Sequence, residues 1–295
     1  MAFRPKNSNT PRPSNSGENT GLFPVPKAGS RKARVSLIVD LGEQNRPDFE
    51  DEKTGETRPQ KPCQQVAVFA DLVNDTVDYG GTIGKQHYRL LLNKTFAGEI
   101  TGINFMFVPP KDAKGKIIEG KEWTLHPANI LTKLAKATNN TDVITSGNIE
   151  ELLNAPFMAQ VEVKEKDSGK TNDASEPIIY RNVNYKGCSE VPLDDDDQPM
   201  QVAELNTEAK CITFQNAKAE DIRFIRKKLI DMIKLANDYA GSNMEKAIQA
   251  FEAQQNSDAP EEAEEEKPKP TKPAAKKPAK KEPEPDEEDE DEAPY

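Results

Sequence analysis

Three stretches of the chain interleave cationic and aromatic side chains, a combination that can contact both the phosphates and the bases of an unpaired nucleic acid strand. Binding of this kind, without sequence preference, needs cations for the phosphates and exposed rings on which bases stack, at ~1–3 kcal/mol for each stacked base. The candidate residues are Lys85, Tyr88, Arg89, Lys94 and Phe96 in the first stretch, Lys111, Lys114 and Trp123 in the second, and Arg181, Tyr185 and Lys186 in the third.

The aromatic candidates differ in their neighbours. Phe69 falls on the wetter side of a predicted strand, and Trp123 stands among polar residues, so both are favoured for stacking. Phe105 and Phe107 share a face with Ile103 and are expected in the core. For any single aromatic residue, ordinary packing in a barrel remains the competing interpretation.

Other motifs that could carry chemistry favour plainer interpretations. The glycine-rich stretch 80–85 lacks the spacing of a phosphate-binding loop and the Ser or Thr that follows it. His87 and His126 are the only histidines, and neither has a cysteine or carboxylate partner at ligand spacing. Four consecutive aspartates at 194–197 point in different directions and are typical of a solvated loop. We therefore expect no catalysis, no metal and no cofactor.

The cysteines and the hydropathy pattern indicate a cellular compartment. The three cysteines are odd in number and widely spaced, which favours reduced thiols over a disulfide framework: Cys63, Cys188 and Cys211. No apolar run approaches the ~18 residues that a membrane-spanning helix needs. We expect a protein of the cytoplasm, the host cytoplasm if a phage encodes it, without a membrane partner.

Charge divides the chain into three predicted regions. Residues 1–31 form a basic arm rich in Asn, Ser, Pro and Gly, and residues 257–295 form an acidic tail. From Asp258 onward the tail holds seven lysines against fifteen carboxylates, whereas the whole chain has a net charge of −11. Such composition predicts disorder at both ends. Residues 32–256 remain for one folded domain.

Periodicity within that domain predicts a mainly β fold with α-helices, of the α+β class. Strands are predicted at about 35–41, 63–73, 99–108, 156–164, 177–186 and 211–214, and helices at 127–137, 148–153, 219–239 and 243–251. Residues 87–94 could form either a short strand or a helix. The strands at 156–164 and 177–186 are expected to form a hairpin, and Ser242 with Glu245 is a capping-box match. This order suggests an OB-like, partly open β-barrel with an inserted helix and C-terminal helices.

The layout of arm, strand-rich body and acidic tail ending in Tyr295 resembles the single-stranded DNA-binding proteins of tailed bacteriophages and their bacterial analogues. The segments from Lys32 to Gly42 and from Trp123 to Leu134 also look like those of putative DNA-binding phage replication proteins. The chain departs from this pattern in the basic Lys/Pro/Ala block 267–281, which lies between two acidic blocks.

The resemblance implies a function for the tail. In that family the acidic C-terminus recruits replication enzymes and competes with DNA for the binding groove. Here this role would fall on Asp286, Glu287, Glu288, Asp289, Glu290, Asp291, Glu292 and Tyr295. The expected partners are single-stranded DNA and, through the tail, a polymerase, primase or helicase. Assembly of the chain into a homo-oligomer remains an open alternative. The alternative hypothesis is an interaction or inhibitor protein that uses its tail as a nucleic-acid mimic, and an enzyme is a third.

Overall fold

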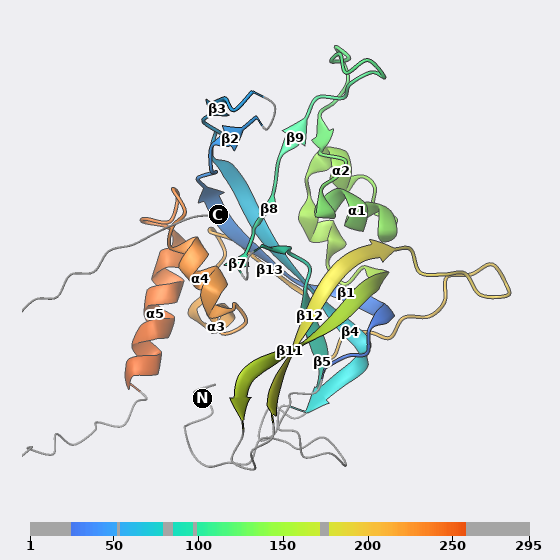
Figure 1. Cartoon of the computed structure of the whole chain (residues 1–295), viewed down its shortest axis with the longest axis vertical. Helices are drawn as coiled ribbons and strands as arrows, with labels where there is room; N and C mark the ends of the chain where they lie inside the picture. The colour runs from blue at the N-terminus through green and yellow to red at the C-terminus, as the bar shows by residue number, and fades with distance from the viewer. Residues whose placement is uncertain (1–24, 52–53, 79–84, 97–98, 172–176, 258–295) are drawn as a thin grey trace, which may run out of the picture. The chain divides into compact units, whose positions relative to one another are not determined.

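A curved, mainly antiparallel sheet is the centre of the described structure (Figure 1). This computed structural model describes residues 25–51, 54–78, 85–96, 99–171 and 177–257. The chain divides by its internal contacts after Asp258, so everything described belongs to the first of two units. Residues 1–24 of the predicted arm, and the predicted tail beyond Ser257, lie outside the described residues.

Five strands form the main path of the sheet, in the order β12-β11-β1-β4-β5, and each neighbouring pair is antiparallel. They are β1 (Gly29–Gln44), β4 (Cys63–Asp78), β5 (Lys85–Leu91), β11 (Pro156–Thr171) and β12 (Pro177–Ser189). Two short strands extend the sheet: β8 (Ile103–Asn104) beside β4, and β13 (Lys210–Ile212) parallel to β1. The end strands β5 and β12 contact each other, yet no ladder joins them among the described residues. The sheet thus curls back on itself and stays partly open.

The predicted hairpin of β11 and β12 is confirmed, and so are the strands predicted in β1 and β4. The undecided residues 87–94 lie mostly in β5. The single strand predicted at 99–108 is wrong, because the chain changes pairing partner along it. Besides β8, two short pairs take its place: β6 (Thr95–Phe96) with β7 (Glu99–Ile100), and β9 (Phe107–Val108) with β10 (Thr124–Leu125). A further short pair, β2 (Phe49–Glu50) with β3 (Thr57–Arg58), lies between β1 and β4 in the sequence.

One face of the sheet buries an inner core, which includes Val68, Leu90 and Phe157. Three helical segments cover it: α1 (Ile130–Ala137), α2 (Val143–Ser146) and the 3-10 helix η1 (Ile149–Leu152). Helix α1 begins three residues later than Pro127, because the side chain of Asn129 accepts a hydrogen bond from the Leu131 N–H at 3.0 Å and caps the helix there.

The opposite face buries an outer core, which includes Leu37, Phe69 and Ile222. Helices α3 (Ala219–Ile222), α4 (Lys227–Ile233) and α5 (Asn243–Ser257) cover this face (Figure 1). The one helix predicted at 219–239 is wrong. A straight helix of that length would extend about 30 Å, whereas the broken segment follows the curved sheet and still buries Leu229 and Ile233.

Strand β1 has apolar residues on both faces because a bulge changes its alternation. Val35 and Ile38 both belong to the inner core although they are an odd number of positions apart, and Leu37 belongs to the outer core. The register shifts between Val35 and Leu37, so that Ser36 occupies the bulge. Its hydroxyl donates a 2.6 Å hydrogen bond to Asp71. The bulge thereby brings the Ser36 hydroxyl to the carboxylate that also accepts a hydrogen bond from Arg89.

Candidate functional site

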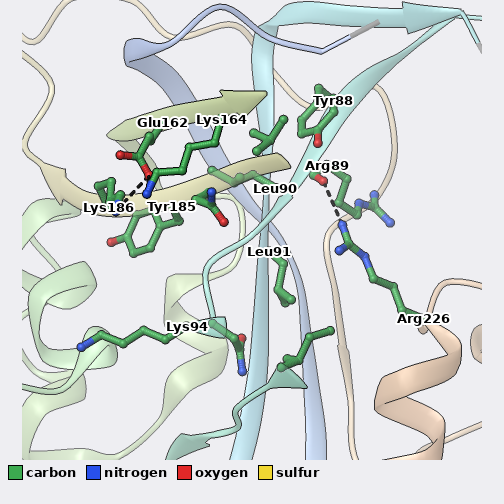
Figure 2. Close-up of a pocket in the computed structure, with 14 residues that line it drawn as sticks. Tyr88, Arg89, Leu90, Leu91, Lys94, Glu162, Lys164, Tyr185, Lys186 and Arg226 are labelled. Carbon is green, nitrogen blue, oxygen red and sulfur yellow. Dashed lines mark hydrogen bonds and ion pairs between the residues drawn. The ribbon is translucent and has the colours of Figure 1, made fainter. Parts of the chain in front are cut away.

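A pocket of about 520 Å³ lies where the sheet stays open, between β5 and the β11–β12 hairpin (Figure 2). Consecutive residues line it from each end strand, 88–91 from β5 and 183–186 from β12. Neighbours on a strand point to opposite faces, so this lining indicates a pocket at the unpaired edges of the strands. We call it the edge pocket.

Five of the twelve residues that the sequence predicts to bind an unpaired strand line the edge pocket. They are Tyr88, Arg89, Lys94, Tyr185 and Lys186. The pocket also contains Lys164 and Arg226, which the sequence did not single out for this role. Glu162 is the one carboxylate in the lining, against five cationic side chains. The described lining therefore carries an excess of positive charge.

Glu162 organises two of the cations. Its Oε2 atom lies 3.0 Å from the Lys186 ammonium and 3.4 Å from the Lys164 ammonium. The contact with Lys186 lowers the pKa of Glu162, and Lys164 lowers it further. The carboxylate thus stays charged and holds both lysines beside it in the lining of the pocket (Figure 2).

Arg89 is held by a buried acid. The Arg89 Nε donates a hydrogen bond to the Asp71 Oδ1 at 2.8 Å, and the Arg89 Nη2 donates to the Asp71 Oδ2 at 3.3 Å. Asp71 is 4% exposed and also accepts the hydrogen bond from Ser36. A buried carboxylate needs such a partner. Arg89 is therefore first a structural cation, fixed in orientation at the pocket wall.

Arg226 reaches the pocket from the outer helical layer. It precedes α4 in an extended conformation, and its guanidinium donates to the Arg89 carbonyl oxygen at 3.5 Å (Figure 2). The same group lies 5.5 Å from the centroid of the Phe69 ring. Periodicity shows which residues of a helix are buried but not where a helix breaks, so the sequence could not indicate that the break between α3 and α4 places Arg226 here.

The prediction that Phe69 lies on the wetter side and stacks on bases is wrong. Its side chain is 1% exposed and belongs to the outer core. As expected from alternation, Phe69 points to the face opposite to that of Val68 and Ala70. Helices α3 to α5, however, cover the face on which Phe69 lies. The apolar stripe of those helices, which includes Ile222 and Leu229, requires an apolar partner, and Phe69 is part of that partner.

Two tyrosines supply the rings of the edge pocket. Tyr88 comes from β5 and Tyr185 from β12, and both are half-buried against the inner core. Burial raises the pKa of Tyr185, and its hydrogen bond to Cys188 does so as well. Both rings are thus fixed by packing on one side while they border the pocket on the other.

The remaining nominated residues lie elsewhere. Lys85 is exposed at the start of β5, and Arg181 pairs with Glu165 at 2.9 Å farther along β12. Lys111, Lys114 and Trp123 belong to the segment that joins β9 and β10, where Trp123 is 59% exposed. Phe96 lies in β6, and its side chain is outside the described residues, as are Asp286–Glu292 and Tyr295 of the predicted tail.

Groups typical of metal or redox chemistry are sparse in the described ranges. No cluster of three or more His, Cys, Asp or Glu residues that could hold a metal ion occurs there. The three cysteines are free thiols, and burial raises the pKa of Cys211 to about 12. Among the helices of the described part, none is long and apolar enough to cross a membrane.

Comparison of the chain with models of protein families, with curated proteins and with solved structures found no match. The geometry of the edge pocket is thus what bears on function.

Proposed function

We propose that the protein binds single-stranded DNA without sequence preference, in the edge pocket, during phage DNA replication and recombination. The observation that carries the proposal is the lining of that pocket: five cationic side chains and two tyrosines meet there with a single carboxylate. Its volume of about 520 Å³ falls within the ~300–1,000 Å³ of small-molecule pockets, which suits one segment of a strand.

The lining residues divide into two roles. Lys94, Lys164 and Lys186 contact phosphates, because these lysines are exposed and carry their ammonium groups on flexible stems. Tyr88 and Tyr185 present ring faces to bases, which all have a π-face, so binding depends little on sequence. Because stacking and phosphate contact ignore base identity, this site would protect any exposed strand.

The order of elements supports the finer assignment of an OB-like barrel. The first long strand pairs with the second and the fourth, the fifth pairs with the fourth, and α1 lies between the third and the fourth. A five-stranded, partly open barrel of this type commonly binds oligonucleotides. The departure is the outer helical layer, which covers a face that such barrels can leave free.

The acidic tail would act on the same site. Its ~40 residues have a root-mean-square reach of order 35 Å, and covalent attachment gives an effective concentration in the ~millimolar range. It would compete with DNA for the edge pocket and, when displaced, recruit a polymerase, primase or helicase through Tyr295. Binding of DNA and recruitment of partners would then be linked.

Paired charge variants test the proposal. Lys186→Gln should weaken binding to a labelled oligothymidine several-fold and lower the log–log salt dependence by about 0.7. Glu162→Gln should strengthen binding, since it removes the one repulsive charge and releases Lys164 and Lys186. Fluorescence anisotropy at several salt concentrations measures both, with the full chain and with the chain truncated after Ser257.

The matched control is Lys234→Gln. Lys234 also pairs with a carboxylate, Glu252 at 2.7 Å, but it lies on the helical layer and outside the pocket lining. It should leave affinity unchanged apart from a small general salt effect. If neither the full chain nor the truncated chain binds at low salt, the proposal is wrong and the interaction protein with a nucleic-acid-mimicking tail takes its place.

A further inference from the structure

A second, smaller pocket of about 310 Å³ lies beside the edge pocket, between β8 and the start of α1. Its walls are mostly apolar, with Ile103, Met106 and Ile130 among them. Polar residues also line it, including Asn104 and His126. We call it the side pocket. Pockets for small ligands are commonly concave and mostly apolar, with a few polar groups that fix the orientation of the ligand.

The border of the side pocket is held by hydrogen bonds. The side chain of Asn129 donates to the Asn104 carbonyl oxygen at 2.6 Å while it caps α1. The hydroxyl of Thr132 donates to the His126 carbonyl oxygen at 2.9 Å. The side pocket is thus preformed, so that binding of a ligand would not have to order the residues around it.

Lys94 joins the two pockets. It lines both of them, and its side chain is exposed. Its backbone is fixed, because its carbonyl oxygen accepts hydrogen bonds from the Thr101 N–H at 3.0 Å and from the Thr101 hydroxyl at 2.9 Å. In Figure 2 the Lys94 side chain is extended and points away from Arg226. One cation is therefore shared by the two pockets.

We infer that the side pocket binds a base of the same single strand, that Lys94 contacts the phosphate between the two pockets, and that the strand continues to Trp123. This inference rests on the proposed function. Trp123 is 59% exposed and precedes His126 by three residues, a span of at most about 10 Å of extended chain. The second cationic stretch thus becomes the far end of a track that starts at the tyrosines.

Two optical signals separate binding from extension along this track. The anisotropy of a labelled oligothymidine reports any binding. The fluorescence of Trp123, the only tryptophan, reports arrival of the strand at the far end. With oligomers of increasing length over the ~4–16 nucleotides typical of one OB fold, anisotropy should rise first, and quenching of Trp123 should appear only with longer oligomers.

A variant that fills the side pocket tests the middle of the track. Ala128 is exposed and lines that pocket, so Ala128→Leu should fold normally and occupy it. It should weaken binding of the longest oligomer about tenfold, as expected for one lost stacked base, and reduce quenching of Trp123. Binding of the shortest oligomers should not change. Ala253→Leu, at an exposed position of α5, is the matched control and should behave like the unaltered chain.

The outcomes distinguish this inference from the proposal on which it rests. If no oligomer changes the anisotropy, both fail. If oligomers bind but Trp123 is never quenched, or if Ala128→Leu binds long oligomers as tightly as the control, the edge pocket stands and the track is wrong. If quenching already occurs with the shortest oligomers that bind, Trp123 belongs to the first contact and the order of sites is also wrong.

Discussion

Three carboxylates of the described unit show how local surroundings decide what a charged side chain does. Asp71 is buried and fully engaged with Arg89 and Ser36. Glu162 is partly exposed and shared by two lysines. Asp40 is half-buried, accepts hydrogen bonds from the Gly42 N–H and the Gln64 amide, and has no cation among the groups that shift its pKa.

The buried pair of Arg89 and Asp71 should be essential to stability. Arg89→Met would leave the Asp71 carboxylate buried without its cation, which should lower the free energy of unfolding by about 3–5 kcal/mol. Urea denaturation measures the loss. The double variant Arg89→Met/Asp71→Asn should recover most of it, because the amide still accepts the Ser36 hydrogen bond. A loss below about 1 kcal/mol in the single variant would show that the pair behaves as a surface ion pair.

Asp40 should make stability depend on pH. Burial raises its pKa in the folded state, and the nearby Asp238 raises it further. As pH falls through that raised pKa, the folded protein takes up a proton before the unfolded chain does, so stability increases. Asp40→Asn lacks this proton uptake. The free energy of unfolding of the variant, compared with that of the unaltered protein at the same pH, should be most favourable near neutral pH. This difference should shrink as pH falls.

Urea denaturation at several pH values measures the Asp40 effect. Asp112→Asn is the matched control, because Asp112 also accepts backbone hydrogen bonds, from Lys114 and Lys116 at 2.9 and 2.8 Å, but is exposed. A stability difference for Asp40→Asn that stays constant or grows as the solution is acidified would contradict the assigned cause.

At the scale of elements, the connections between strands do as much to shape the site as the strands themselves. The break between α3 and α4 brings Arg226 to the edge pocket. The end of α2 supports the β9–β10 pair, and Trp123 lies in the segment that joins these two strands. There Gly147 has a φ of +73° and ends α2 against the rings of Phe105 and Phe107. The two rings pack edge to face, with centroids 5.6 Å apart.

Gly147→Ala should loosen this support. A Cβ at this position would lie 2.7 Å from the Phe107 Cζ and 3.0 Å from the Phe105 Cζ, in addition to the strain of a positive φ. We expect a loss of about 2–4 kcal/mol in the free energy of unfolding. Gly115→Ala is the control, because φ there is +80° but nothing lies within 4 Å of a Cβ. Equal losses in the two variants would mean that the rings can move aside.

At the scale of the whole molecule, charge is distributed unevenly. The chain carries −11 in total, whereas the edge pocket is lined by five cations and one carboxylate. The acidic residues from Glu282 onward lie in the second unit. A polyanion tethered to a protein with a cationic pocket is expected to compete with other polyanions at low salt.

Truncation after Ser257 should therefore tighten binding of single-stranded DNA, and the gain should fade as salt rises, since the Debye length shortens from ~30 Å at 0.01 M to ~3 Å at 1 M. The same truncation should abolish capture of a replication polymerase, primase or helicase in a pull-down. Tyr295→Ala should impair capture with little effect on DNA affinity. Unchanged affinity and unchanged capture after truncation would remove the tail from the mechanism.

Local patterns in the sequence were sufficient to locate much of the fold. Alternation predicted β1, β4 and the β11–β12 hairpin, because period two follows from the geometry of a single strand. The capping pair of Ser242 and Glu245 marked the start of α5, and the Glu245 N–H indeed donates to the Ser242 hydroxyl at 3.0 Å. These features depend on contacts within a few residues, which a linear pattern records.

The site required contacts between distant parts of the chain. Tyr88 and Lys186 come from different halves of the domain and line one pocket only because the sheet curls until its end strands meet. Phe69 is on the face that alternation assigned to it, but whether that face is wet depends on helices about 150 residues later. Arg226 likewise reaches the pocket through a helix break. Periodicity tells which residues share a face, whereas burial and proximity depend on what packs against that face.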